Sequence, residues 1–297
     1  MRNDTFSTYH PVINFTYFIL VAGLSMFVMH PVFLGISMTS GFAYYVYLKG
    51  KKALRTMICF FVPIFLLSSI VNPLFNHKGM TLLFYLKSGN PITLESILYG
   101  LAAGVMIVSV LAWCSCYQCV MTSDKFIYLF GKLIPALSLL LAMVLRFVPK
   151  FSAQIHKVSD AQKCIGRDVS NGKLPARLKK GMKILSIMVT WALENSVETA
   201  DSMKARGYGL RGRTQFSVYR FDSRDKMMFA GMAAAGIFLA VILIFKKIFV
   251  YYYPILVLNE HTALAHLAYC VYGLFCFLPL AVNIVEDIKW HYLKSKI

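Results

Sequence analysis

The chain has 297 residues, of which 58% are hydrophobic and 15% are charged, and its mean hydropathy is +0.62. Soluble domains are usually about half apolar, so this composition predicts a polytopic membrane protein in contact with the lipid bilayer. The formal net charge of +18 is also found in nucleic-acid-binding proteins, but here the basic residues fall in loops between apolar runs. That distribution is typical of membrane proteins and argues against nucleic acid as a partner.

The N-terminus and the cysteines give two further expectations. Met1-Arg2-Asn3-Asp4 lacks the basic region and cleavage site of a signal peptide, so the first apolar run is expected to remain as an anchor. The seven cysteines are scattered and several lie in apolar runs, which argues against a secreted disulfide framework. We expect free thiols.

Six apolar runs predict six membrane spans, since each can cross about 30 Å of hydrocarbon. They are residues 12–29, 32–48, 54–71, 96–120, 227–245 and 262–285. The segment from Phe75 to Ile92 is less apolar and is interpreted as an external loop. A basic cluster from Lys49 to Arg55 follows the second run, and positive charge prefers the cytoplasmic side. Both termini are therefore predicted to be cytoplasmic.

A basic region separates the fourth run from the fifth and divides the chain into parts 1–123, 124–226 and 227–297. Residues 124–226 contain 19 Lys and Arg against 8 Asp and Glu, so we expect them to be cytoplasmic. The apolar piece 133–148 is short for a span and is predicted to be an interfacial or buried helix. Pro149 is interpreted as a bend into a second helix. A third helix is predicted from Pro175 to Arg206.

The third helix is predicted to be amphipathic and to end at Gly207. Its apolar side has residues at three- and four-residue steps, and the opposite side is polar. The apolar set is Leu185, Met188, Ala192, Ala200 and Met203, and the polar set is Ser186, Thr190, Glu194, Glu198 and Ser202. Gly207 easily adopts the left-handed conformation that closes a helix, which places Arg206 in the last turn. Arg206 could then bind an acidic or carbonyl-lined groove of a partner, although a basic residue at a helix end is also ordinary.

Catalytic and metal-binding patterns are weak in this sequence. Cys114-Ser115-Cys116-Tyr117-Gln118-Cys119 is rich in thiols, but no second ligand pair accompanies it. His261 and His266 are five residues apart and would not share a helix face. Paired carboxylates, a zinc-protease helix, a Walker A loop and a nucleophile elbow are not found in the sequence. We therefore expect no enzymatic activity, no metal site and no cofactor.

Met203, Ala205-Arg206-Gly207 and Tyr208 closely resemble the second Ala-Arg-Gly motif of the T component of energy-coupling factor (ECF) transporters, the EcfT/CbiQ family. The segment Leu145–Pro149 resembles the same family, as do His10-Pro11 and Asn72-Pro73. In that family two long cytoplasmic coupling helices rest on a pair of ABC ATPases and connect them to a membrane-embedded, substrate-binding S component. The resemblance implies a non-enzymatic coupling subunit of the prokaryotic plasma membrane, for uptake of vitamins or transition-metal ions.

The resemblance places ATPase docking at two helix ends. The intact second motif is Ala205, Arg206 and Gly207, whereas Cys164, Ile165 and Gly166 stand where the first Ala-Arg-Gly is expected. Either Ile165, through apolar contact, or Arg167, through its charge, could replace the missing arginine.

Two other classes of protein remain as alternatives. A stand-alone secondary transporter of a small solute would usually have polar coupling residues within its spans, and these are scarce here. A membrane enzyme of lipid or peptide chemistry would need convergent ionisable groups.

Overall fold

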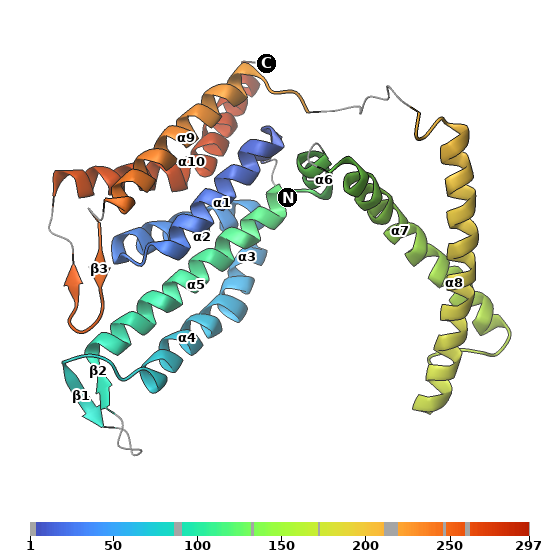
Figure 1. Cartoon of the computed structure of the whole chain (residues 1–297), viewed down its shortest axis with the longest axis horizontal. Coiled ribbons are helices and arrows are strands. Elements are labelled where there is room, and N and C mark those ends of the chain that lie inside the picture. The colour runs from blue at the N-terminus through green and yellow to red at the C-terminus, as the bar shows by residue number, and fades with distance from the viewer. Residues whose placement is uncertain are drawn as a thin grey trace. The chain divides into compact units, whose positions relative to one another are not determined.

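The computed structural model describes residues 4–85, 91–131, 134–171, 173–210, 219–245, 248–258 and 262–296. Its contacts divide the chain into two compact units (Figure 1). The membrane unit comprises residues 1–125 and 219–297, and the hairpin unit comprises residues 126–218, which lie inside the basic region 124–226. Both units are built mainly of α-helices.

The membrane unit contains most of the elements. They are η1 (Phe6–Thr8), α1 (Pro11–Phe27), α2 (Pro31–Lys49), α3 (Lys51–Thr56), the π-helical turn η2 (Met57–Phe61), α4 (Val62–Phe75), β1 (Leu82–Tyr85), β2 (Pro91–Thr93), α5 (Leu94–Val120), α9 (Ser223–Ile244), β3 (Val250–Tyr251), β4 (Val257–Leu258) and α10 (Ala263–Lys294). The helices of the remaining residues are α6 (Ser123–Gly131), α7 (Pro135–Cys164) and α8 (Leu174–Ala205).

Five of the described helices are long and apolar enough to cross a membrane, which confirms an all-α polytopic membrane fold. Four belong to the membrane unit: the continuous helix Lys51–Phe75, α5, α9 and α10. They correspond to the last four predicted spans. The first two predicted spans are α1 and α2, with 17 and 19 residues. The fifth candidate is Ser138–Cys164 of α7, which overlaps the piece 133–148 that was expected to be an interfacial or buried helix.

Two local predictions were wrong. The segment Phe75–Ile92 is not only a loop, because β1 and β2 form an antiparallel hairpin in which Leu82 pairs with Thr93. The expected pair of helices meeting at Pro149 is one helix, α7, with the proline inside it. Phe151, two residues after Pro149, packs against Trp191 of α8, a contact between distant residues that local propensity does not reveal.

Two His-Pro pairs begin α1 and α2 in the same way. His10 and His30 are the N-cap residues, and their Nδ1 atoms accept hydrogen bonds from the amides of Val12 and Val32, each at 3.3 Å. Proline suits the first helical position because its missing N–H would have no partner there. The turn between α1 and α2 is therefore capped locally.

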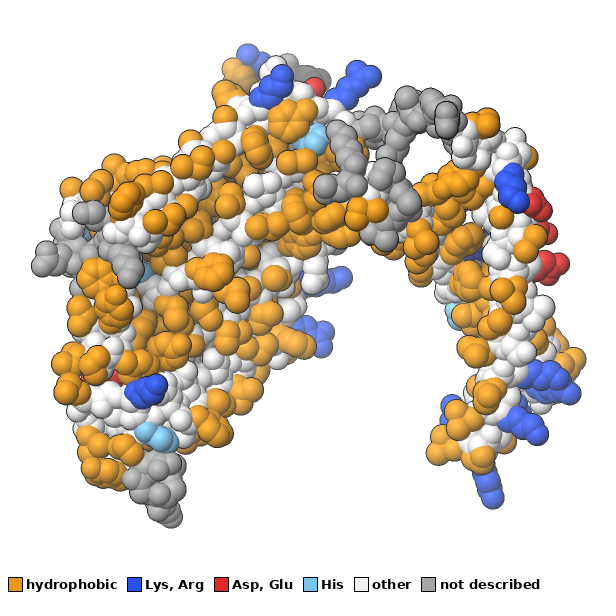
Figure 2. Space-filling view, viewed as in Figure 1, with side chains coloured by type: hydrophobic (Ala, Val, Ile, Leu, Met, Phe, Trp, Pro, Cys, Tyr) orange, Lys and Arg blue, Asp and Glu red, His pale blue; other side chains and the backbone are white. Residues whose placement is uncertain are grey.

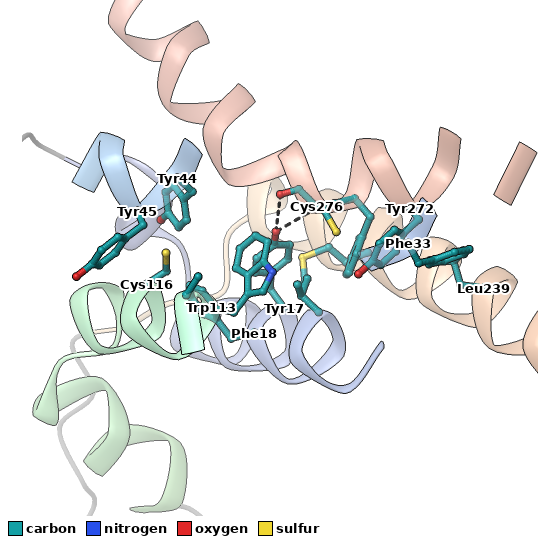
Figure 3. Packing of buried hydrophobic residues seen from close by; sticks show 14 of the residues in the cluster. Tyr17, Phe18, Phe33, Tyr44, Tyr45, Trp113, Cys116, Leu239, Tyr272 and Cys276 are labelled. Atoms are coloured by element: carbon teal, nitrogen blue, oxygen red, sulfur yellow. Dashed lines mark hydrogen bonds between the residues drawn. The ribbon is translucent and has the colours of Figure 1, made fainter. Parts of the chain in front are cut away.

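Aromatic side chains from four helices form the core of the membrane unit (Figure 3). The Tyr17 ring of α1 lies 6.0 Å from Trp113 of α5 and 5.3 Å from Phe275 of α10, measured between centroids. The indole N–H of Trp113 donates to Ser37 Oγ of α2 at 3.0 Å. The indole N–H of Trp113 is therefore paired within the core, as a water-free environment requires.

Tyr17 also supplies a hydrogen-bond donor that the helix α10 lacks at Pro279. Pro279 has no N–H, so the carbonyl of Phe275 four residues earlier has no helical donor. The Tyr17 hydroxyl donates to the carbonyls of Phe275 and Cys276 at 3.2 and 3.0 Å (Figure 3). A proline within an apolar helix is thus accommodated by a neighbouring side chain.

Helices α4 and α5 approach closely at two glycines spaced by four residues. A Cβ at Gly100 would lie 2.9 Å from the Ser69 carbonyl oxygen, and one at Gly104 would lie 2.8 Å from Ser69 Oγ. Small residues at this spacing allow close backbone approach in membranes.

We expect Gly104→Leu to separate α4 from α5 and to lower the stability of the membrane unit by roughly 1–3 kcal/mol, the usual cost of overpacking. Thermal unfolding of the purified protein in detergent would measure it. Gly23→Leu in α1 is the matched control, because a Cβ there has no neighbour within 4 Å. Equal thermal stability of the two variants would contradict the close contact.

Candidate functional site: the capped ends of α7 and α8

Helices α7 and α8 form an antiparallel hairpin (Figure 1). Phe151 packs edge-on against Trp191 with centroids 5.2 Å apart, and Arg177 Nε donates to the Val169 carbonyl at 2.9 Å. Later residues of α7 and its following loop thus contact earlier residues of α8. The C-terminal ends of the two helices consequently lie at opposite ends of the hairpin.

The end of α8 is closed by a complete Schellman motif. Gly207 has φ +73°, and its amide donates to the Lys204 carbonyl at 2.9 Å. The Tyr208 amide donates to the Met203 carbonyl at 3.0 Å. The left-handed role predicted for Gly207 is confirmed, while Arg206 is the C-cap residue, one position beyond the last helical residue Ala205.

The end of α7 has the same motif. Gly166 has φ +76°, its amide donates to the Lys163 carbonyl at 2.9 Å, and the Arg167 amide donates to Gln162 O at 2.9 Å. Cys164 is the last helical residue and Ile165 is the C-cap. Ile165 therefore occupies the position of Arg206, and Arg167 occupies that of Tyr208. The two helix ends have the same backbone conformation and differ in the side chain at the C-cap position.

Both C-cap side chains are accessible in the hairpin unit. Ile165 is 61% exposed, and Arg206 is exposed as well. An exposed isoleucine on a rigid turn is suited to an apolar groove, and an exposed guanidinium is suited to carboxylates or carbonyls.

The loop after the α7 cap is fixed by Asp168. Its carboxylate accepts hydrogen bonds from the Ser170 hydroxyl at 2.6 Å and the Ser170 amide at 2.9 Å. These bonds favour the charged form and lower the pKa of Asp168 below its usual value. The turn therefore keeps its geometry at neutral pH.

A groove of about 670 Å³ between α7 and α8 leads to the second cap. Arg146, Lys150 and Glu198 line it together with Arg206 and Tyr208. Among the described residues the ion pairs are Lys163–Asp160 and Lys289–Glu286, so neither arginine of the groove has a carboxylate partner there. Two arginines are thus available at this end. Sequence reasoning did not assign Arg146 to the site; its only signal was its place in the Leu145–Pro149 segment.

The single apolar face predicted for α8 is instead two faces. Met188 is 6% exposed and lies on the side of α8 that packs on α7, whereas Leu185 is 66% exposed. The exposed apolar residues recur at three- and four-residue steps and are called the exposed stripe below. They are Leu174, Leu178, Met182, Leu185, Val189, Leu193 and Val197. Within the described part of the chain, nothing covers this stripe.

The thiols of the cysteine-rich segment do not converge. Cys114 is exposed, Cys116 is buried and Cys119 is half-buried, all of them free. The described residues contain no group of three or more potential metal ligands. Of the two histidines His261 and His266, His261 lies outside the described residues.

The fold and the caps define a polytopic helical membrane protein with one hairpin whose two helix ends carry the same cap. The chain belongs to the CbiQ family, because the family model described as "Cobalt transport protein" matches residues 9–218. This confirms the resemblance to ECF transporter T components.

Several similar proteins are described as transmembrane proteins of energy-coupling factor transporters. The chain is 31% identical over 104 residues to the energy-coupling factor transporter transmembrane protein EcfT of Exiguobacterium sibiricum, covering 35% of this chain and 40% of that protein. It is 33% identical over 98 residues to EcfT of Listeria innocua, covering 33% of this chain and 37% of that protein. It is 31% identical over 113 residues to EcfT of Leuconostoc gelidum, covering 38% of this chain and 42% of that protein. The chain thus matches about two fifths of the length of these relatives.

Proposed function

We propose that this protein is the transmembrane coupling subunit of an ECF-type ABC importer for a vitamin or a transition-metal ion. It transmits the motions of two ATPase subunits to a substrate-binding S component and performs no hydrolysis itself. The observation that carries this proposal is the repetition of one Schellman cap at opposite ends of the α7–α8 hairpin. Two equivalent rigid ends match two ATPase subunits.

The two ends differ in chemistry, and so do the grooves that we propose for them. Arg206 is suited to acidic or carbonyl groups, whereas Ile165 is suited to an apolar pocket. Two non-identical ATPase subunits fit this difference better than two identical ones.

The exposed stripe offers a surface for the S component. Its second half, from Val189 to Val197, is apolar and at least half exposed. Burial of such a patch against a second membrane subunit would remove apolar area from water.

Co-purification from native membranes followed by mass spectrometry tests the proposal. We expect two ABC ATPases and one small membrane protein to accompany this chain. Substrate uptake into vesicles that contain this chain alone would instead establish the secondary transporter.

We expect Ile165→Asp to weaken association with one ATPase by about 2 kcal/mol or more, because an unpaired carboxylate would enter an apolar groove. Arg167→Ala is the companion variant and is expected to leave binding nearly unchanged, since Arg167 lies beyond the cap. Binding of the purified ATPase to each variant gives the comparison. A large loss in Arg167→Ala alone would assign the contact to the arginine.

We also propose that both termini and the hairpin unit are cytoplasmic. A Lys173→Cys variant in intact cells should resist a membrane-impermeant maleimide, whereas Lys78→Cys should react. The parent chain is the blank, because it already has exposed cysteines such as Cys164 and Cys59. Labelling of Lys173→Cys from outside above this blank would overturn the orientation. The topology also predicts Lys247 to be external, and this residue lies outside the described residues.

A further inference from the structure

The first half of the exposed stripe contains a hollow of about 450 Å³. Its lining is apolar except for one cation, Arg177. The lining residues are Val169, Leu174, Arg177, Leu178, Gly181, Met182 and Leu185. Gly181 forms part of the lining without a side chain, and a Cβ built there meets no atom within 4 Å. The hollow is thus open and apolar, with the guanidinium of Arg177 at its edge.

Basic residues predominate in the stretch of α8 that lines this hollow, while Asp168 directly precedes the lining residue Val169. Five basic residues and no acidic residue occur from Lys173 to Lys183, whereas Glu194, Glu198 and Asp201 lie further along α8. Figure 2 shows several Lys and Arg side chains toward one end of α8 and the acidic ones, with a basic side chain beside them, toward the other. The cations are therefore concentrated on the half of the helix that has the hollow.

Arg177 is held at the edge of the hollow by a hydrogen bond. Its Nε donates to the Val169 carbonyl at 2.9 Å, which fixes the plane of the guanidinium and leaves its terminal nitrogens for another acceptor. Lys179 and Lys183 are exposed on the same stretch. A phosphate at this edge would receive charge-assisted hydrogen bonds.

We propose that this hollow binds an anionic phospholipid, with an acyl chain against Gly181 and the phosphate beside Arg177. The hairpin unit is joined at both ends to apolar helices, so the membrane surface is present at high effective concentration. An apolar stripe flanked by cations is the arrangement by which helices lie on anionic bilayers. An apolar side chain of a partner protein could fill the hollow but would leave the neighbouring cations unused.

The test uses the full-length protein in nanodiscs that contain phosphatidylglycerol with a photoreactive acyl chain. After illumination and pepsin digestion, mass spectrometry locates the labelled peptides. We expect label on the peptide that contains residues 174–185, in addition to the lipid-facing side of α4. Phosphatidylcholine with the same photoreactive chain should label α4 equally and α8 less.

Two variants and one control complete the experiment. Gly181→Leu fills the hollow, and it favours the helix over glycine, so folding is not threatened. Arg177→Gln removes the charge. Arg177→Gln is expected to reduce labelling of α8 about fivefold, as loss of one surface cation typically does for anionic lipid. Gly181→Leu is expected to reduce this labelling because its side chain occupies the space of the acyl chain. Ala176→Leu adds the same side chain on another face of α8 and should have no effect.

Unchanged α8 labelling in Gly181→Leu would overturn the site, and equal labelling by both lipids would overturn its preference for anionic lipid. If co-purified partner proteins abolish α8 labelling in the wild-type complex, the occupant is a protein and the proposal is wrong. Labelling of α4 in every sample shows that the nanodiscs are intact.

Discussion

Arg206→Ala is expected to abolish stable binding of one ATPase subunit and substrate uptake, while the protein still inserts into the membrane. Removing one partner of a buried charge-assisted contact typically costs about 2–5 kcal/mol, partly because the other partner is left unpaired. Arg206 caps α8 from an exposed position and has no ion pair among the described residues, so its loss should not disturb the hairpin itself. ATPase pull-down and uptake into whole cells would measure both effects.

Arg206→Lys and Lys204→Ala make this prediction specific. Lysine keeps the charge but lacks the planar fork of donors, so only partial recovery of binding is expected. Lys204 is a second exposed cation in the last turn of α8, and its removal should have a small effect. Full recovery with Arg206→Lys would indicate generic electrostatics. Wild-type assembly and uptake in Arg206→Ala would contradict the docking role.

The membrane spans could be predicted because lipid requires long apolar runs, and such runs are visible in any window of the sequence. The β1–β2 hairpin could not, since its strands are only four and three residues long and depend on contacts with each other. The bend predicted at Pro149 was wrong because the structure there also depends on contacts between distant residues. It removes one hydrogen bond from α7, but packing of α7 on α8 retains the helix on both sides.

Within the candidate site, the role of Gly207 could be predicted from the sequence, but the contacts between α7 and α8 could not. Gly207 indicated a helix end from its residue type alone, and φ +73° bears this out. The groove shared by Arg146 and Arg206 joins residues sixty positions apart, so local spacing does not reveal it. The exposed stripe was missed because Leu185 and Met188 lie close enough on a helical wheel to be assigned to one face.

Gly207→Val is expected to impair ATPase binding through the backbone rather than through a lost contact. A left-handed residue costs roughly 1–2 kcal/mol when it carries a side chain, and a β-branched one is the least tolerated. A Cβ at Gly207 would also lie 2.9 Å from Leu210 Cδ1, so the Leu210 side chain must move. Loss of the left-handed conformation redirects Arg206, and a displacement of that guanidinium breaks a contact that depends on direction. The binding constant of the purified ATPase gives the size of the loss.

Gly207→Asn distinguishes this backbone effect from mere added bulk. Asparagine tolerates the left-handed conformation better than other residues with a side chain, so Gly207→Asn should retain most of the binding that Gly207→Val loses. Gly166→Val offers the parallel test at the other cap, where φ is +76° but a Cβ meets no atom within 4 Å. If backbone conformation is the cause, Gly166→Val should weaken the Ile165 contact even without a clash. Normal binding in both valine variants would show that neither cap directs its docking residue.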